Sequence, residues 1–175
     1  MQNFQLDIDP CEHLTADAFG RPGQRTFYLQ ASKEGETTTI LIEKLQLQTM
    51  AIGIEKYLAE LESHNLTLEP SNDDYDEDAM RISVLGEPLF RAGDIGIGYE
   101  NASDRMLLVV KEILLSEMEP DDASQVRIWC SRNQAKALAR WSMELAIRGR
   151  SNCPQCGLPM EPEGHFCLKK NGYRH

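Results

Sequence analysis

No apolar run in this chain of 175 residues approaches the roughly 20 residues that a membrane-spanning helix needs. The longest apolar runs are as short as Met106–Val110. Residues 1–10 carry two aspartates and no basic residue, so they lack the positive and apolar regions of a secretory signal. We therefore expect a protein without a membrane span that resides in the cytoplasm.

Motifs of the common enzyme classes are also missing. The sequence contains no G-x-S-x-G, no H-E-x-x-H and no phosphate loop, and His13, His64 and His175 are not grouped with a nucleophile. Cys11 could be a reactive thiol, but an ordinary residue beside a strand end is the stronger interpretation, and Cys130 is expected in the core. No catalytic residue is predicted, and the balance favours a protein that is not an enzyme.

Basic residues are scarce in most of the chain. The formal net charge is -10, yet residues 1–126 contain 9 Lys and Arg against 25 Asp and Glu, and residues 127–175 contain 9 against 3. One interpretation is that the basic tail docks on the acidic body, and the other is that it recognises an anionic partner, nucleic acid or an acidic protein. The overall negative charge makes nucleic acid the less favoured partner.

Hydrophobic periodicity and turn residues predict both strands and helices. Ser131 and Gln134 form a capping box that marks the start of the second helix. Gly96 and Gly98 leave one face of a strand bare, which predicts the close approach of a helix or backbone there. The predicted elements are a strand at 4–8, a hairpin of 26–31 and 38–43, a helix at 45–61, a hairpin of 90–99 and 106–115, a strand at 125–130 and a helix at 132–149.

These elements predict an α+β fold, in which an antiparallel sheet has two amphipathic helices packed on one face and a small C-terminal zinc knuckle closes against the body. The first helix is expected to pack on the first hairpin. We place the body at residues 1–150, with two half-units at 1–68 and 80–150, and the tail at 151–175. The half-units are suggested by an offset of 88 residues that places Gln46 on Gln134. Six carboxylates in residues 69–78 predict a solvated connection between the half-units.

The strongest chemical signal lies in the tail. A Cys-Pro-Gln-Cys-Gly turn is followed by a His-x-Cys pair, and the four metal-ligand residues are Cys153, Cys156, His165 and Cys167. Zinc favours this set because it accepts thiolate and imidazole ligands in a tetrahedron, and a C-x-x-C turn directs two thiolates at one ion. Four protein ligands leave no position for an activated water, so we expect structural zinc whose binding folds the tail.

Two other interpretations of these cysteines remain. A C-x-x-C motif can be a redox dithiol, but such motifs open a helix after a strand, whereas Cys153 and Cys156 lie in a stretch of turns. A disulfide is disfavoured by the expected cytoplasmic location and by the odd count of 5 cysteines.

A polar cluster surrounds the turn that precedes the first hairpin. Its members, which we consider for binding an anion or a peptide, are Arg21, Gln24, Arg25, Glu43 and Lys44. The alternative interpretation is a solvated hairpin edge.

Three stretches carry a resemblance to a known family. They are G-x-P-G-Q-R-T-F-Y-L-Q-A at 20–31, E-K-x-Q at 43–46, and C-P-x-C-G-x-P, E-G-H-x-C and N-G-Y-R within 153–174. In these the chain resembles an uncharacterised bacterial family, domain of unknown function 3090, over nearly its whole length. The resemblance implies no activity, but it adds weight to Gln24-Arg25 and Glu43-Lys44 as a shared surface.

Together these observations favour a non-enzymatic binding or regulatory protein. Structural zinc would stabilise a C-terminal recognition tail that carries Lys169, Lys170, Tyr173 and Arg174. One alternative is an enzyme that acts on a phosphorylated or nucleotide-like ligand in a polar cleft near Arg21, Gln24, Arg25 and Lys44. Another is a redox dithiol protein that uses Cys153 and Cys156.

Overall fold

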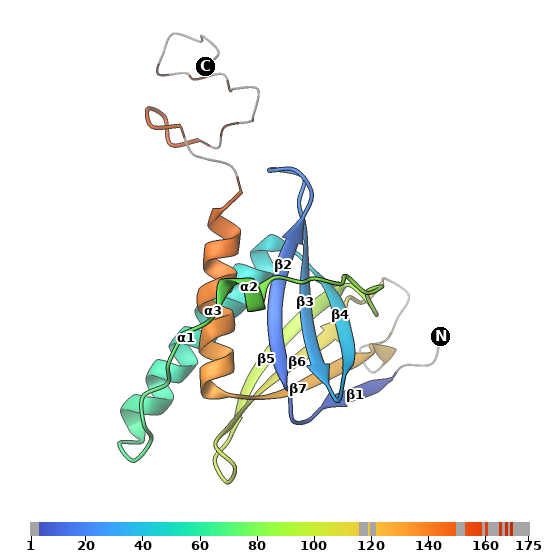
Figure 1. Cartoon of the computed structure of the whole chain (residues 1–175), viewed down its shortest axis with the longest axis vertical. Coiled ribbons are helices and arrows are strands. Elements are labelled where there is room, and N and C mark those ends of the chain that lie inside the picture. The colour runs from blue at the N-terminus through green and yellow to red at the C-terminus, as the bar shows by residue number, and fades with distance from the viewer. Residues whose placement is uncertain are drawn as a thin grey trace.

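The computed structural model describes residues 4–115, 119, 122–149, 153–158, 160, 165, 167 and 169. Figure 1 shows two sheets beside a pair of long helices, with the C-terminal turn beyond the end of the second long helix. In chain order the elements are β1 (Gln5–Ile8), β2 (His13–Phe19), β3 (Thr26–Lys33), β4 (Glu36–Ile42), α1 (Lys44–His64), α2 (Glu77–Met80), β5 (Ala92–Glu100), β6 (Arg105–Glu112), β7 (Gln125–Ser131) and α3 (Arg132–Ile147).

The strands form two sheets, so the α+β class is confirmed but the prediction of a single antiparallel sheet is wrong. β2, β3 and β4 form one antiparallel meander, and β5, β6 and β7 form another, to which β1 adds by parallel pairing with β7. Each meander ends in a helix instead of continuing into the next strand. One isolated bridge between Leu41 and Arg91 links the described strands of the two sheets, and their inner faces share a single core.

β2 is the strand that the sequence analysis missed. Leu14, Ala16 and Ala18 point into the core, as alternation requires, but Thr15 and Asp17 on the other face are buried as well. The chain after α2 covers that face, where Thr15 Oγ1 donates to the Met80 carbonyl (2.5 Å) and Asp17 Oδ2 accepts from the Ile82 amide (3.0 Å). Two small alanines and a buried carboxylate hide the hydrophobic signal of this strand.

The two long helices occupy the predicted positions. The spacing of three and four between apolar residues in the sequence predicts one buried stripe on this helix: α1 buries Leu47, Met50, Ile54 and Leu58, whereas Leu61 of the same stripe is half-buried. It packs chiefly against α3 and β5, so its predicted place on the first hairpin is wrong, whereas α3 contacts strands of both sheets. None of the described helices combines the length and the apolar character needed to cross a bilayer.

The close approach of helix and strand occurs at a different glycine from those predicted. A Cβ at Gly53 of α1 would lie 3.0 Å from Ile97 Cδ1 of β5, so a glycine lets this helix approach the sheet. On the opposite face of β5, the atom nearest to a Cβ at Gly96 or Gly98 would be 3.8 Å away on the neighbouring strand. Gly96 and Gly98 therefore face away from the helix.

The acidic connection is exposed at most of its positions, as predicted, but it also packs on α3 at two residues. Ser71 is buried, and its carbonyl accepts from Lys136 Nζ of α3 (3.1 Å). The Tyr75 ring meets Trp141 of α3 edge-on, with 5.6 Å between ring centroids. Asp76 caps the short helix α2 by accepting from two backbone amides. Five of the six carboxylates are exposed, so the solvated character is confirmed, but the stretch is ordered because it packs on α3 and contains the start of α2.

The order of elements repeats, since a three-stranded meander followed by a helix occurs twice. Gln46 and Gln134, each the third residue of its helix, accept through Oε1 from the amides of Glu43 and Ser131, at 2.9 Å in both cases. Through Nε2 each glutamine also donates to two consecutive carbonyls at the start of the opposite unit. Gln46 donates to Ala92 and Gly93, the first residues of β5, and Gln134 donates to Cys11 and Glu12, directly before β2. The predicted capping box at Ser131 is confirmed.

Candidate metal centre

The turn at 153–158 is closed by its own backbone. The Gly157 amide donates to the Cys153 carbonyl (2.8 Å), and the Cys153 amide donates to the Leu158 carbonyl (2.8 Å). Gly157 has φ +75°, a left-handed conformation that glycine adopts without strain. These features explain why the Cys-Pro-Gln-Cys-Gly sequence places both thiols on the same side of the turn.

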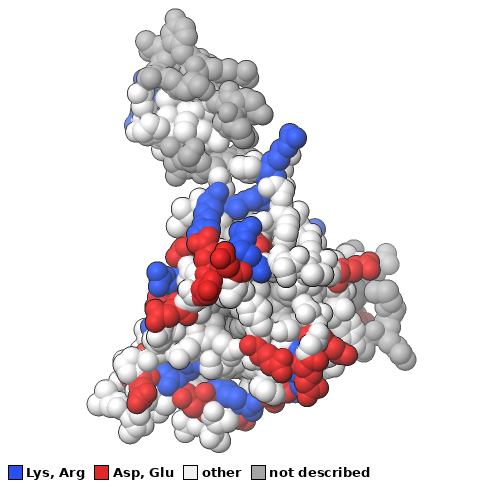
Figure 2. All heavy atoms as spheres, in the orientation of Figure 1, with Lys and Arg blue, Asp and Glu red and all other residues white. Residues whose placement is uncertain are grey.

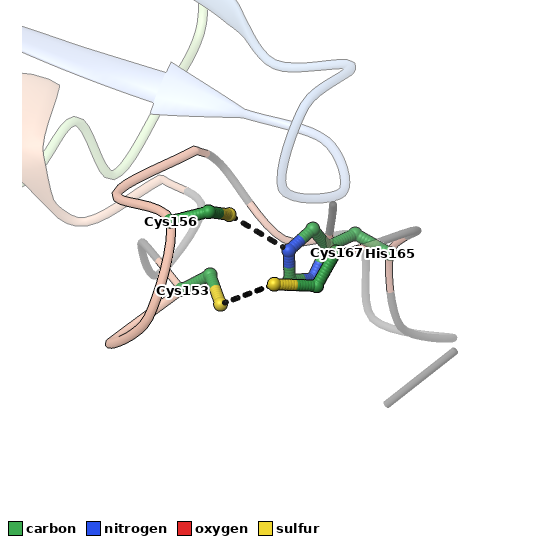
Figure 3. Close-up of side chains that lie close together, drawn as sticks. All are labelled: Cys153, Cys156, His165 and Cys167. Carbon is green, nitrogen blue, oxygen red and sulfur yellow. Dashed lines mark hydrogen bonds between the residues drawn. The ribbon is translucent and has the colours of Figure 1, made fainter. Parts of the chain in front are cut away.

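The four predicted ligand residues come together in space. Cys153, Cys156, His165 and Cys167 each offer one ligand atom, and these atoms all lie within 4.8 Å of one another. In Figure 3 the Cys153 sulfur faces the Cys167 sulfur (3.9 Å), and the Cys156 sulfur faces His165 Nε2 (3.2 Å). Zinc–sulfur and zinc–nitrogen bonds in a regular tetrahedron require separations of about 3.8 Å and about 3.5 Å. The cluster could therefore hold a metal ion of this kind.

The surroundings of the thiols favour a metal ligand over a disulfide. The backbone amide of Cys156 holds the pKa of the Cys153 thiol below its ordinary value, and the Gln155 amide donates to the same sulfur (3.4 Å). Metals bind the thiolate form, so these amides prepare Cys153 for coordination. All 5 cysteines are free. The C-x-x-C segment is a turn and does not open a helix, unlike the dithiols of redox proteins.

Part of the predicted recognition tail lies outside the described residues. Of the four residues assigned to recognition, only Lys169 is described, and it is exposed. Lys170, Tyr173 and Arg174 cannot be placed.

The predicted polar cluster is only partly assembled. Arg25 and Lys44 meet beside Gly149, where Arg25 Nη2 donates to the Leu145 carbonyl of α3 (2.9 Å). Glu43 instead forms an ion pair with Arg91, and Arg21 and Gln24 shape the turn through a backbone bond of 2.9 Å. A shallow pocket of about 240 Å³ lies elsewhere, lined by residues 93–94, 111–114 and 123. The predicted cluster is thus divided, since Arg25 and Lys44 lie at the end of α3, Glu43 pairs with Arg91, and Arg21 and Gln24 belong to the turn.

The two remaining cysteines are unsuited to nucleophilic chemistry. Burial raises the pKa of Cys11 to about 11 and that of Cys130 to about 12. Both thiols are buried in the core. They stay protonated at neutral pH, as expected for the structural role that the sequence indicated.

One polar site was missed by the sequence analysis. Arg132, the first residue of α3, is buried and forms ion pairs with Asp104 (2.7 Å) and Glu62 (3.0 Å). Its Nη1 also donates to the Glu69 carbonyl (2.7 Å). The partners lie 28 to 70 positions away in the sequence, so no local motif reveals the site.

Comparisons with known proteins place the chain in a family. No curated protein and no solved structure matches it. Residues 6–167 match the family described as "Protein of unknown function (DUF3090)", which includes the whole metal cluster and both meander-helix units. The chain belongs to this family.

Proposed function

We propose that this is a non-enzymatic binding protein whose C-terminal tail is organised by structural zinc. The observation that carries the proposal is the cluster of three cysteines and one histidine within 4.8 Å. Three sulfur atoms and one imidazole nitrogen are a ligand set that zinc prefers over magnesium, calcium or manganese. Because four protein ligands complete the tetrahedron, the metal would shape the tail and leave no open position for catalysis.

The partner that we propose is anionic. The tail at 151–175 carries Lys169, Lys170 and Arg174 against two glutamates, and the adjoining residues 127–150 carry 6 Lys and Arg against one glutamate. Lys169, two positions beyond the last metal ligand, is exposed. A tail folded around zinc would hold its basic residues in a defined arrangement, which lowers the entropic cost of recognition.

The metal content tests the first part of this proposal. We expect one zinc per chain in protein purified without added metal, as measured by elemental mass spectrometry. The double variant Cys153→Ser, Cys156→Ser should lose it, whereas Cys11→Ala, outside the cluster, should keep it. Both tryptophans, Trp129 and Trp141, lie in the body, so their near-ultraviolet circular dichroism shows whether the body stays folded. Metal-free protein with reversibly oxidised thiols would replace the zinc proposal by the redox alternative.

Truncation tests the second part. A chain that ends at Arg150 lacks all four ligands but keeps α3. We expect it to fold and to lose binding partners that the full chain captures in cells. If the truncated chain captures the same partners, the tail is not the recognition element.

A further inference from the structure

Each of the two long helices begins with a basic residue that lies near a charged side chain of its own meander. At the start of α3, Arg132 is neutralised by Asp104, with Nε and Nη2 at 2.7 and 3.1 Å from the carboxylate, and by Glu62 at 3.0 Å. We call Arg132, Asp104 and Glu62 the closed end. The single positive charge of this arginine is therefore neutralised within the protein.

The start of α1 occupies the corresponding place in the first unit. Lys44 and Arg132 are the first residues of their helices, two positions before the matching Gln46 and Gln134. Arg25 and Asp104 each directly precede the second strand of their meander. Where the second unit has a cation and a carboxylate, the first unit therefore has two cations. We call Lys44 and Arg25 the open end.

These two cations are close together. A Cβ at Gly149 would lie 3.2 Å from Arg25 Nη2 and 3.7 Å from Lys44 Nζ, so both reach the same point at the end of α3. Arg25 donates to the Leu145 carbonyl, which caps α3, and lies over the Phe27 ring at 5.2 Å from its centroid, but neither contact brings a negative charge to the guanidinium. Among the residues that the structure describes, neither Arg25 nor Lys44 has a carboxylate within ion-pair distance.

The nearest carboxylates are already engaged. Asp17 is buried, pairs with Arg81 (3.2 Å) and accepts from two backbone amides. Glu43 pairs with Arg91. Burial lowers the pKa of Arg25, and Arg81 adds to this effect against the opposing charge of Asp17. The open end thus concentrates positive charge with which no carboxylate of the described residues pairs.

The location of this charge matters. Figure 2 shows Lys and Arg side chains gathered at the end of the body from which the C-terminal segment leaves. The N-terminus of α1 adds the positive end of its helix dipole. The two cations lie close together and repel each other, and a bound anion would relieve that repulsion.

We propose that the open end binds the carboxylates of an acidic segment of a partner protein, which take the places that Asp104 and Glu62 have at the closed end. The inference rests on the proposed function, because it names the chemistry of the partner. Carboxylates are favoured over other anions since the chain itself uses them at the matching position. A short acidic segment meets less repulsion from the acidic body than a long nucleic acid would.

A charge reversal at Lys44 tests this proposal. Lys44 is exposed and has no described hydrogen bond or ion pair, so Lys44→Glu should fold normally. Lys56→Glu, on an exposed position of the same helix, makes the same change in net charge away from the open end and is the matched control. The probe is a fluorescein-labelled peptide of eight glutamates, and its anisotropy is followed with the full metal-loaded chain at low and at physiological salt.

We expect the wild type and Lys56→Glu to bind the peptide with similar affinity, and Lys44→Glu to bind about tenfold or more weakly. The affinity should fall as salt rises. Equal loss in both variants, or no binding by the wild type at low salt, would overturn the proposal. Stronger binding of a single-stranded oligonucleotide or of inorganic phosphate, lost in Lys44→Glu alone, would assign the site to a different anion and also overturn it.

Metal content separates this proposal from the previous one. Lys44→Glu should keep its zinc, so loss of peptide binding with zinc retained is specific to the open end. A zinc-free wild type that still binds the peptide through Lys44 would refute the structural zinc and leave the open end intact.

Discussion

Arg132 offers the most direct test of how the two units are joined. Its side chain is 10% exposed and connects the start of α3 to Glu62 of α1 and Asp104 of the β5–β6 turn. The variant Arg132→Met keeps the apolar stem and removes the charge. It leaves Glu62, 19% exposed, and Asp104, 46% exposed, without their cation.

The expected cost follows from that burial. Breaking a buried ion pair by removing one partner destabilises a protein by about 3 to 5 kcal/mol, and the exposure of Asp104 places this case near about 3 kcal/mol. With a urea dependence of about 2 kcal/mol per molar, the unfolding midpoint should fall by about 1.5 M. Arg127→Met, which removes an exposed pair with Asp7, is the control and should cost much less.

The loss of stability caused by Arg132→Met should also depend on pH. The hydrogen bond from Arg132 lowers the pKa of Asp104 below its ordinary 3.8. Burial acts to raise the pKa of Glu62, but hydrogen bonds from Ser71 and Arg132 outweigh it and leave the pKa below 4.5. A carboxylate with a lowered pKa in the folded state contributes stability above its unfolded pKa and loses it as the pH falls through the folded value. The difference between wild type and Arg132→Met should therefore be full at pH 7 and shrink below about pH 4.

Urea unfolding followed by tryptophan fluorescence at pH 7, 5 and 3.5 measures both effects. A difference under about 1 kcal/mol at pH 7 would show that the ion pairs are solvated like surface pairs. A difference that is the same at pH 7 and pH 3.5 would refute the assignment to the two carboxylates.

Three further predictions follow from the core and the helix starts. Gln46→Ala and Gln134→Ala should each destabilise the protein by about 1 to 2 kcal/mol in urea unfolding, because each removes a cap and two bonds to carbonyls; a neutral effect of either would contradict the matching of the two units. Gly53→Ala should change stability by under about 1 kcal/mol, since better helix propensity offsets crowding at 3.0 Å, whereas Gly53→Leu should cost about 1 to 3 kcal/mol and lower the melting temperature. Cys11 and Cys130 should not react with a thiol reagent at pH 8 in the native protein. A chelator should expose the three thiols of the metal cluster, and denaturant should expose all 5 cysteines. Fast reaction of a fourth thiol before unfolding would show that burial does not protect Cys11 and Cys130.

Local signals were sufficient for most elements of the fold. The capping box at Ser131 and the spacing of Leu47, Met50, Ile54 and Leu58 depend on residues close in sequence, and both predictions are confirmed. The metal cluster was predicted for the same reason, because its four ligands lie within 15 consecutive residues. The bacterial origin, the cytoplasmic location and the identity of the metal stay predictions.

Long-range packing decided what the sequence could not. β2 is covered on both faces by segments distant in sequence, which removed the alternation that would have revealed it. The number of sheets depends on how two meanders close around one core, and no single stretch encodes that choice.

The sequence by itself determined the two long helices, the two predicted hairpins and the grouping of the three cysteines and one histidine, since hydrophobic period, capping and ligand spacing act between near neighbours. Only the tertiary structure decided which charges meet. It brought Arg132 to Asp104 and Glu62, and it placed Lys44 beside Arg25, where no described carboxylate pairs with either. Electrostatic interactions depend on distance in space, and chain folding alone sets that distance for residues far apart in sequence.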